Sequence, residues 1–344
     1  MQRQELIELI DANREALSPA LSSKALKLRR QYYGDSVFVR GLIEFTNYCK
    51  NNCYYCGIHA GNSNLSRYRL DKKTILACCA EGARLGMHTF VLQGGEDPYF
   101  TDKRVCEIVS AIKTRFPDCA VTLSIGEKPR ASYQAYFDAG ADRYLLRHET
   151  ADDAHYARLH PKELSLENRK RCLYDLREIG FQVGAGFMVG TPYQTTETLA
   201  SDLGFLQELQ PQMVGIGPFL PHHDTIFRAE PAGSLQLTLT MLCLTRILLP
   251  KTLLPATTAL ATLDPKGREM GFQVGANVVM PNLSPAAVRG SYALYDHKKA
   301  SGDEAAEGLA QLRRQIEEAG FRMDMSRGDS VLSLPTINPE RRGG

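Results

Sequence analysis

Three cysteines lie close together in the segment FTNYCKNNCYYCG, residues 45–57. They are Cys49, Cys53 and Cys56, and their spacing is Cys-x3-Cys-x2-Cys. A disulfide needs two cysteines, and a covalent nucleophile needs only one. A set of three therefore indicates a metal ion or a metal cluster.

Two metal groups are compatible with this loop. Zinc takes four ligands, and His59 could supply the fourth in a Cys-x3-Cys-x2-Cys-x2-His pattern. A [4Fe–4S] cluster held by three thiolates would leave one iron open to chelate a substrate or cofactor, such as the amine and carboxylate of S-adenosylmethionine. Structural zinc usually stabilises small domains without a core, and a chain of 344 residues has ample core. The length of the chain, and the position of the cysteine loop after the first expected strand, therefore favour the cluster over zinc.

Bulk composition excludes several kinds of partner. The chain carries 41 basic and 39 acidic residues, a formal net charge of +2, which argues against nucleic acid or an anionic membrane. It has no run of about 18 apolar residues, so no membrane-spanning helix is expected, and its charged N-terminus has no signal-peptide core. Nine cysteines in such a chain indicate a reducing compartment, so we expect a cytoplasmic protein.

Apolar strand-like runs alternate with helix-periodic stretches along most of the chain. Such alternation predicts parallel strands with helices outside them. Eight units fit a complete (β/α)8 TIM-type barrel, and a doubly wound open sheet is the alternative. We expect one domain over residues 1–344, with N-terminal helices over 1–36, the barrel over 37–298, and a C-terminal helix and tail over 299–344. The expected strands are 37–47, the first part of 88–97 (a strand followed by a turn), 120–128, 142–150, 182–190, 213–221, 253–260 and 275–283.

Polar and reactive residues stand at the end of each expected strand. In a barrel these ends gather at one face, where reactive groups are found. The cysteines follow the first strand, and the GGE sequence at 94–96 follows the second, which further favours an iron–sulfur cluster over zinc. The sequence therefore predicts a polar, active mouth over an apolar body.

Two local patterns near this mouth have more than one interpretation. Side chains alternate along a strand, so Arg147 and Glu149 are expected on one face, where they could orient a charged ligand or form a structural ion pair. His222 and His223 could bind a metal ion. Adjacent residues of an extended chain point in opposite directions, so we expect no shared ion.

These motifs resemble the radical S-adenosylmethionine superfamily, in which the cysteine triad holds the cluster. Longer phrases between about residues 38 and 295 are similar to the [FeFe]-hydrogenase maturase HydE family. The phrases are VLQGGEDPY, DRYLLRHETA, ENRKRCL, GAGFMVGTP, MVGIGPFLPHHDT, LTRILLP, PATTALAT and GANVVMPNLSP.

The resemblance implies roles for particular residues. Cys49, Cys53 and Cys56 would ligate one [4Fe–4S] cluster, and Arg169 would pair with the carboxylate of S-adenosylmethionine. The other residues implied at the cofactor are Tyr55, Gln93, Gly94, Glu96, Ser124, Glu149, Met188 and Tyr292. The residues implied in a substrate chamber are Arg147, Met213, Thr257, Thr258 and Met280.

The resemblance also implies a substrate and partners. The substrate would be a small anionic iron–carbonyl–cyanide complex carrying cysteine, and the partners would be a low-potential electron donor and other hydrogenase maturation factors. Some family members carry further cysteines near the C-terminus for an accessory cluster, but the last cysteine here is Cys243, so one cluster is expected. The alternatives are a related radical enzyme acting on an organic amino acid or thioether, and a zinc-binding scaffold.

Overall fold

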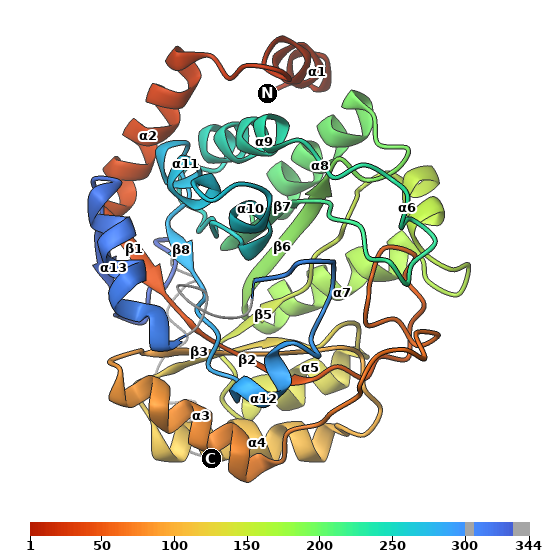
Figure 1. Cartoon of the computed structure of the whole chain (residues 1–344), viewed down its shortest axis with the longest axis vertical. Coiled ribbons are helices and arrows are strands. Elements are labelled where there is room, and N and C mark those ends of the chain that lie inside the picture. Colours follow the sequence, from red (N-terminus) through yellow and green to blue (C-terminus); the bar gives the residue numbers. More distant parts are fainter. Residues whose placement is uncertain (300–305, 333–344) are drawn as a thin grey trace.

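A six-stranded parallel sheet forms the centre of the protein (Figure 1). The computed structural model describes residues 1–299 and 306–332. Neighbouring strands follow the order β2-β3-β4-β5-β6-β7, and each neighbouring pair is parallel. The strands are β2 (Gly41–Thr46), β3 (Thr89–Gly94), β4 (Ala120–Ser124), β5 (Arg143–Leu145), β6 (Gln182–Val189) and β7 (Met213–Pro218). The parallel α/β arrangement predicted from sequence is confirmed for this part.

Helices connect the strands and lie outside the sheet (Figure 1). Those between β2 and β7 are α3 (Lys72–Arg84), α4 (Asp102–Arg115), α5 (Arg130–Asp138), α6 (Asp153–Leu159), α7 (Leu166–Ile179) and α8 (Thr196–Leu209). Those after β7 are α9 (Leu235–Leu248), α10 (Thr258–Leu263), α11 (Gly267–Gln273) and α12 (Ala286–Arg289). Two helices, α1 (Arg3–Ala12) and α2 (Pro19–Tyr33), precede the first strand.

The expected first strand, 37–47, is divided into two at Arg40. Its first half, β1 (Ser36–Val39), pairs with β8 (Val278–Val279) and β9 (Arg322–Asp324) in a separate three-stranded sheet. Its second half, β2, pairs with β3. The continuous apolar run of 37–47 could not reveal that its two halves have different partners.

The C-terminal region contains a strand where a polar tail was expected. Buried Phe321 and Met323 alternate with exposed Arg322, so β9 presents its apolar side to the core while it pairs with β1. Before it lie a short 3-10 helix (Ala306–Gly308) and α13 (Leu309–Glu318). Residues 300–305 of the expected helix and 333–344 of the expected tail lie outside the described residues.

The expected strand over 253–260 is wrong. Only a short extended segment lies there: Leu253 accepts a hydrogen bond from the Val214 N–H at 2.9 Å, and the Ala256 N–H donates to Val278 at 2.9 Å. Helix α10 then begins at Thr258. Pro255 has no N–H to donate, so this stretch cannot continue a regular ladder.

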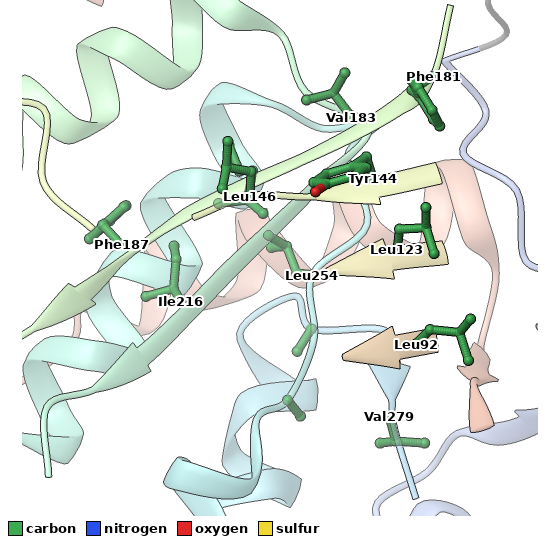
Figure 2. Packing of buried hydrophobic residues seen from close by; sticks show 14 of the residues in the cluster. Leu92, Leu123, Tyr144, Leu146, Phe181, Val183, Phe187, Ile216, Leu254 and Val279 are labelled. Atoms are coloured by element: carbon green, nitrogen blue, oxygen red, sulfur yellow. The ribbon is translucent and has the colours of Figure 1, made fainter. Parts of the chain in front are cut away.

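Most of the apolar core lies between the strands and the surrounding helices. Figure 2 shows this packing, with buried side chains from β3 through β8 in one cluster. Leu123, Tyr144, Phe187 and Ile216 are among its fully or almost fully buried members. Close packing of this kind holds the carboxyl ends of the strands at fixed positions, and the polar residues described below stand at those ends.

Candidate active site

A cavity of about 370 Å³ opens at the carboxyl ends of the strands. This volume is in the usual range for small-molecule sites. Every residue predicted for the cluster, the cofactor or the substrate chamber lines it, except Met213. The lining includes Cys49, Cys53, Tyr55, Cys56, Gln93, Gly94, Glu96, Ser124, Arg147, Glu149, Arg169, Met188, Thr257, Thr258, Met280 and Tyr292.

The prediction that Met213 faces the substrate chamber is wrong. Met213 is the first residue of β7, so it lies at the amino end of its strand, away from the mouth. Its Sδ is 2.9 Å from Arg40 Nη1, and the cavity that it lines is a separate one of about 10 Å³. Leu145 and Met280, which do line the large cavity, pack against the apolar cluster that contains Met213.

The three cysteines form a tight loop after β2. All three are free thiols, and the Cys56 N–H donates to the Cys53 carbonyl at 3.2 Å to close a turn. Burial raises the pKa of the Cys53 thiol to about 12 and also raises that of Cys49 and Cys56. Such thiols become thiolates when a cationic metal group binds and displaces their protons. Three soft, half-buried donors on one turn fit an iron–sulfur cluster.

His59 is hydrogen-bonded to other parts of the chain. Its Nε2 lies 3.1 Å from the carbonyl of Asp224, and its Nδ1 lies 3.4 Å from Asn52 Oδ1. A fourth zinc ligand would need one of these nitrogens. The contacts therefore count against the zinc alternative.

A half-buried arginine that was not predicted from the sequence fixes the cysteine loop. Arg67 Nη1 donates to the carbonyls of Asn47 at 2.5 Å and Ile58 at 2.9 Å. Its Nη2 donates to the carbonyls of His59 at 2.6 Å and Asn62 at 3.1 Å. The guanidinium has five donors in a rigid fork, which suits it to hold several backbone carbonyls at once. These contacts join the start and end of the loop.

The GGE turn after β3 packs directly on the cysteine loop. The Glu96 N–H donates to Cys49 Sγ at 3.4 Å, and Lys50 Nζ lies 3.3 Å from Glu96 Oε2. A Cβ on Gly95 would lie 2.3 Å from the Tyr48 carbonyl oxygen and 2.7 Å from Cys49 Cβ. Only glycine allows so close an approach at this position. The turn and the loop are therefore one structural unit.

Arg147 and Glu149 form an ion pair beside the cavity. Arg147 Nη2 lies 3.0 Å from Glu149 Oε2, and both residues line the cavity. The expected pairing is confirmed, but its expected cause is wrong. Strand β5 ends at Leu145, and Glu149 has a left-handed backbone with φ of 67°, so simple strand alternation does not place it.

Arg169 is paired with a carboxylate that sequence analysis did not assign to the site. It lies on α7, whose N-cap Ser165 accepts the Asn168 N–H at 3.2 Å. Arg169 Nε lies 2.7 Å from Glu127 Oε1. Burial alone would lower the pKa of Arg169, but Tyr156 and Glu127 outweigh it and raise that pKa well above its usual value. The position of Glu127, at the end of the third predicted strand, was the available signal.

A segment after α12 crosses the mouth of the cavity. Tyr292, Leu294, Tyr295 and Lys298 of this segment line the cavity, and Figure 1 shows it passing in front of the strands. Lys298 Nζ lies 2.5 Å from Oε1 of buried Glu44. Of these residues, only Tyr292 was predicted from the sequence. Lys298, Tyr295 and Glu44 were missed because no local pattern marks a contact between residues so distant in the chain.

The expectation that His222 and His223 point in opposite directions is wrong. Their rings stack with centroids 4.4 Å apart, and His223 Nδ1 lies 2.6 Å from Asp296 Oδ1. One ligand atom from each of these three residues lies within 4.8 Å of the others. The Asp224 N–H donates to His222 Nδ1 at 3.1 Å, so the proton of a neutral His222 sits on Nε2, the nitrogen near Asp296. The contacts are those of a hydrogen-bonded cluster.

Comparisons with known proteins agree with this site. A model of the Radical SAM superfamily matches residues 43–206. The chain is 48% identical over 296 residues to the [FeFe] hydrogenase maturase subunit HydE of Thermotoga maritima, covering 86% of this chain and 84% of that one. The crystal structure of methylornithine synthase (PylB) superposes with a TM-score of 0.78 at 25% identity and covers 94% of both chains. The structure of the maturase HydG superposes at 0.75 with 17% identity, which shows a shared fold.

The cysteine loop and the superfamily match define the protein as a radical S-adenosylmethionine enzyme, a class that uses a [4Fe–4S] cluster and S-adenosylmethionine. Within this class, the identity over most of both chains shows that it belongs to the [FeFe] hydrogenase maturase HydE family. No helix in the described part of the chain is long and apolar enough to cross a membrane.

Proposed function

We propose that this protein cleaves S-adenosylmethionine reductively and acts on a small precursor of the [FeFe]-hydrogenase active centre. One observation carries the proposal. Three half-buried thiols share a cavity with polar atoms, such as Arg147 Nε and Thr257 Oγ1, that have no hydrogen-bond partner among residues 1–299 and 306–332. Buried polar atoms normally have hydrogen-bond partners, so unpaired ones on residues that line a cavity indicate a polar ligand.

The cysteines would hold the cluster, and the residues around them would hold the cofactor. When bound, these groups supply methionine and a 5′-deoxyadenosyl radical. The fork of Arg169 suits the cofactor carboxylate, and the carboxylate of Glu149 suits a cationic or hydroxyl group. The remaining cofactor contacts would come from Tyr55, Gln93, Gly94, Glu96, Ser124, Met188 and Tyr292, which all line the cavity.

The substrate would lie deeper, against Arg147, Thr257, Thr258 and Met280. Arg147 supplies positive charge, and the buried hydroxyl of Thr257 can donate or accept a hydrogen bond, which suits a small anionic complex. The segment around Tyr292 and Tyr295 covers the mouth and would keep water away from the reactive intermediate.

The proposed partners follow from the chemistry. Reductive cleavage needs a low-potential electron donor, and assembly of a hydrogenase centre needs further maturation factors. Neither nucleic acid nor a membrane is expected as a partner, in keeping with the near balance of charges. Nine free thiols are in keeping with a reducing compartment such as the cytoplasm.

We further propose that the strands close into a barrel. The Leu42 N–H donates to Pro281 at 2.9 Å, and the segment around Leu253 bonds to both β7 and β8. These contacts support a closed barrel of eight strand positions in one domain, in which residues 253–256 take the seventh position as an irregular extended segment. A closed wall around the cavity would suit radical chemistry.

The function can be tested by maturation in vitro. Inactive [FeFe] hydrogenase would be incubated with the other maturation factors, with or without this protein, and hydrogen production measured. We expect activity only when the reconstituted protein is present. Activation without it, combined with conversion of an organic amino acid or thioether by the protein alone, would contradict the proposal and favour the methylornithine synthase-like alternative.

A further inference from the structure

A fully buried histidine and aspartate lie directly behind the cavity wall. His148 and Asp202 both have no exposed surface, and His148 Nε2 lies 3.3 Å from Asp202 Oδ1. His148 Nδ1 accepts the Gly186 N–H at 3.3 Å, so the proton of a neutral His148 sits on Nε2 and faces Asp202. Burial lowers the pKa of His148 and raises that of Asp202, which favours an uncharged pair.

This pair connects three elements at the base of the Arg147–Glu149 ion pair. Asp202, on α8, accepts the Ala151 N–H at 2.5 Å. His148 holds the backbone of β6 at Gly186, and the Gly186 carbonyl accepts the Glu149 N–H at 3.0 Å. The turn between β5 and α6 is therefore fixed on both sides of Glu149.

Glu149 needs such support because its backbone is strained. A left-handed conformation is unfavourable for a non-glycine residue, and it persists only where the surroundings enforce it. Arg147 and Glu149 flank His148 in the chain and point into the cavity, whereas His148 points away from it into the core.

We infer that Asp202 and His148 are positioning residues that hold Glu149 in its working orientation at the cofactor and Arg147 in its working orientation at the substrate. The inference rests on the proposed function, because it assigns Glu149 to S-adenosylmethionine. Neither Asp202 nor His148 lines the cavity, so both would act only through the turn that they fix.

A double-mutant cycle tests this inference. The affinity for S-adenosylmethionine would be measured by titration of the anaerobically reconstituted protein carrying Asp202→Ala, Glu149→Ala or both. We expect each single change to weaken binding about tenfold, as for loss of one hydrogen bond to a charged group. The double variant should be no weaker than Glu149→Ala alone, because Asp202 would have nothing left to position.

Two further variants separate positioning from general stability. Asp202→Asn keeps an oxygen for the Ala151 N–H and resembles a protonated Asp202, so it should bind within about threefold of wild type. Leu203→Ala, on the same helix and fully buried, should lower the melting temperature without changing cofactor affinity.

Additive losses, about a hundredfold in the double variant, would show that Asp202 acts independently of Glu149 and would overturn the inference. Weakened binding in Asp202→Ala with unchanged binding in Glu149→Ala would overturn it as well. The proposed function would survive either result, because it depends on cleavage of S-adenosylmethionine by the wild-type protein.

Discussion

The two ends of the central sheet contain similar charged groups but are built differently. At the carboxyl ends of the strands, Arg147 and Arg169 border a cavity of about 370 Å³. At the amino ends, Arg40 and Arg143 border a space of only about 10 Å³, enough for roughly one water molecule. Arginines that are buried or half-buried therefore stand at both ends, and the space beside them is what differs.

The C-terminal segment closes the amino end. Arg143 Nη2 donates to Asp329 Oδ1 at 2.6 Å and to the Arg327 carbonyl at 2.7 Å. Arg40 Nη2 donates to the Gly328 carbonyl at 3.2 Å. At this end the chain provides most of the partners for its own guanidinium groups, whereas at the mouth the arginine and carboxylate groups remain accessible to a ligand. The comparison teaches that a buried charge indicates function only when it is next to a cavity.

The largest expected effect is at the cysteine loop. Cys53→Ser should abolish the cluster, because a hydroxyl is a poor ligand for iron at neutral pH, so iron should fall from about four atoms per chain to almost none. Cys106→Ala is the matched control: Cys106 lies on α4 outside the cavity, and iron should stay at the wild-type level. Iron would be counted after anaerobic reconstitution. Full retention of iron in Cys53→Ser would show that the cysteine loop does not hold the cluster.

A change at the closed end should affect stability alone. Asp329→Ala leaves Arg143 buried without its countercharge, which should lower the free energy of unfolding by about 2–4 kcal/mol, since partial exposure of Asp329 reduces the cost of breaking a buried pair. Affinity for S-adenosylmethionine should not change. Denaturant unfolding and cofactor titration would measure both. If Asp329→Ala instead weakened S-adenosylmethionine binding and left the free energy of unfolding unchanged, the amino end would be the ligand-binding end, and the account would be wrong.

The stability effect of Asp329 should also depend on pH. Burial alone would raise the pKa of Asp329, but the contacts with Arg143, Arg327 and Gln182 outweigh burial and hold this pKa below its usual value. A carboxylate of this kind stabilises the fold above its unfolded pKa of about 3.9, and the contribution is lost as the pH falls further. The difference between wild type and Asp329→Ala should therefore shrink below about pH 4.

A smaller effect is expected when one arginine of the open end is changed. Arg169→Leu should weaken binding of S-adenosylmethionine by about 1.5–3 kcal/mol, the usual contribution of a hydrogen bond to a charged group. Because this change leaves Glu127 without its ion-pair partner, it would be combined with Glu127→Gln, and Glu127→Gln alone would be the control. Iron content should not change. An unaltered affinity in the titration would assign Arg169 a structural role.

Much of the open end could be predicted from sequence, because its residues follow strands. The cysteines, the GGE turn and Arg147 come directly after apolar runs, and the ends of parallel strands meet in space. The position of Met213 was wrong because a residue at the first position of a strand faces the other end of the sheet.

The remaining features depend on contacts that no local pattern encodes. Lys298 reaches Glu44 across 254 positions, and Asp329 reaches Arg143 across 186. The left-handed backbone of Glu149 and the stacking of His222 on His223 depend on partners elsewhere in the chain. Strand β9 was missed because its apolar alternation is only three residues long.

The most direct test of the account is cleavage of S-adenosylmethionine by the reduced, reconstituted wild-type protein. Under anaerobic conditions with a strong reductant, 5′-deoxyadenosine and methionine would be quantified by chromatography. The account predicts both products in equal amounts from wild type and neither from Cys53→Ser. A reduced wild-type protein with a full complement of iron that forms neither product would contradict it.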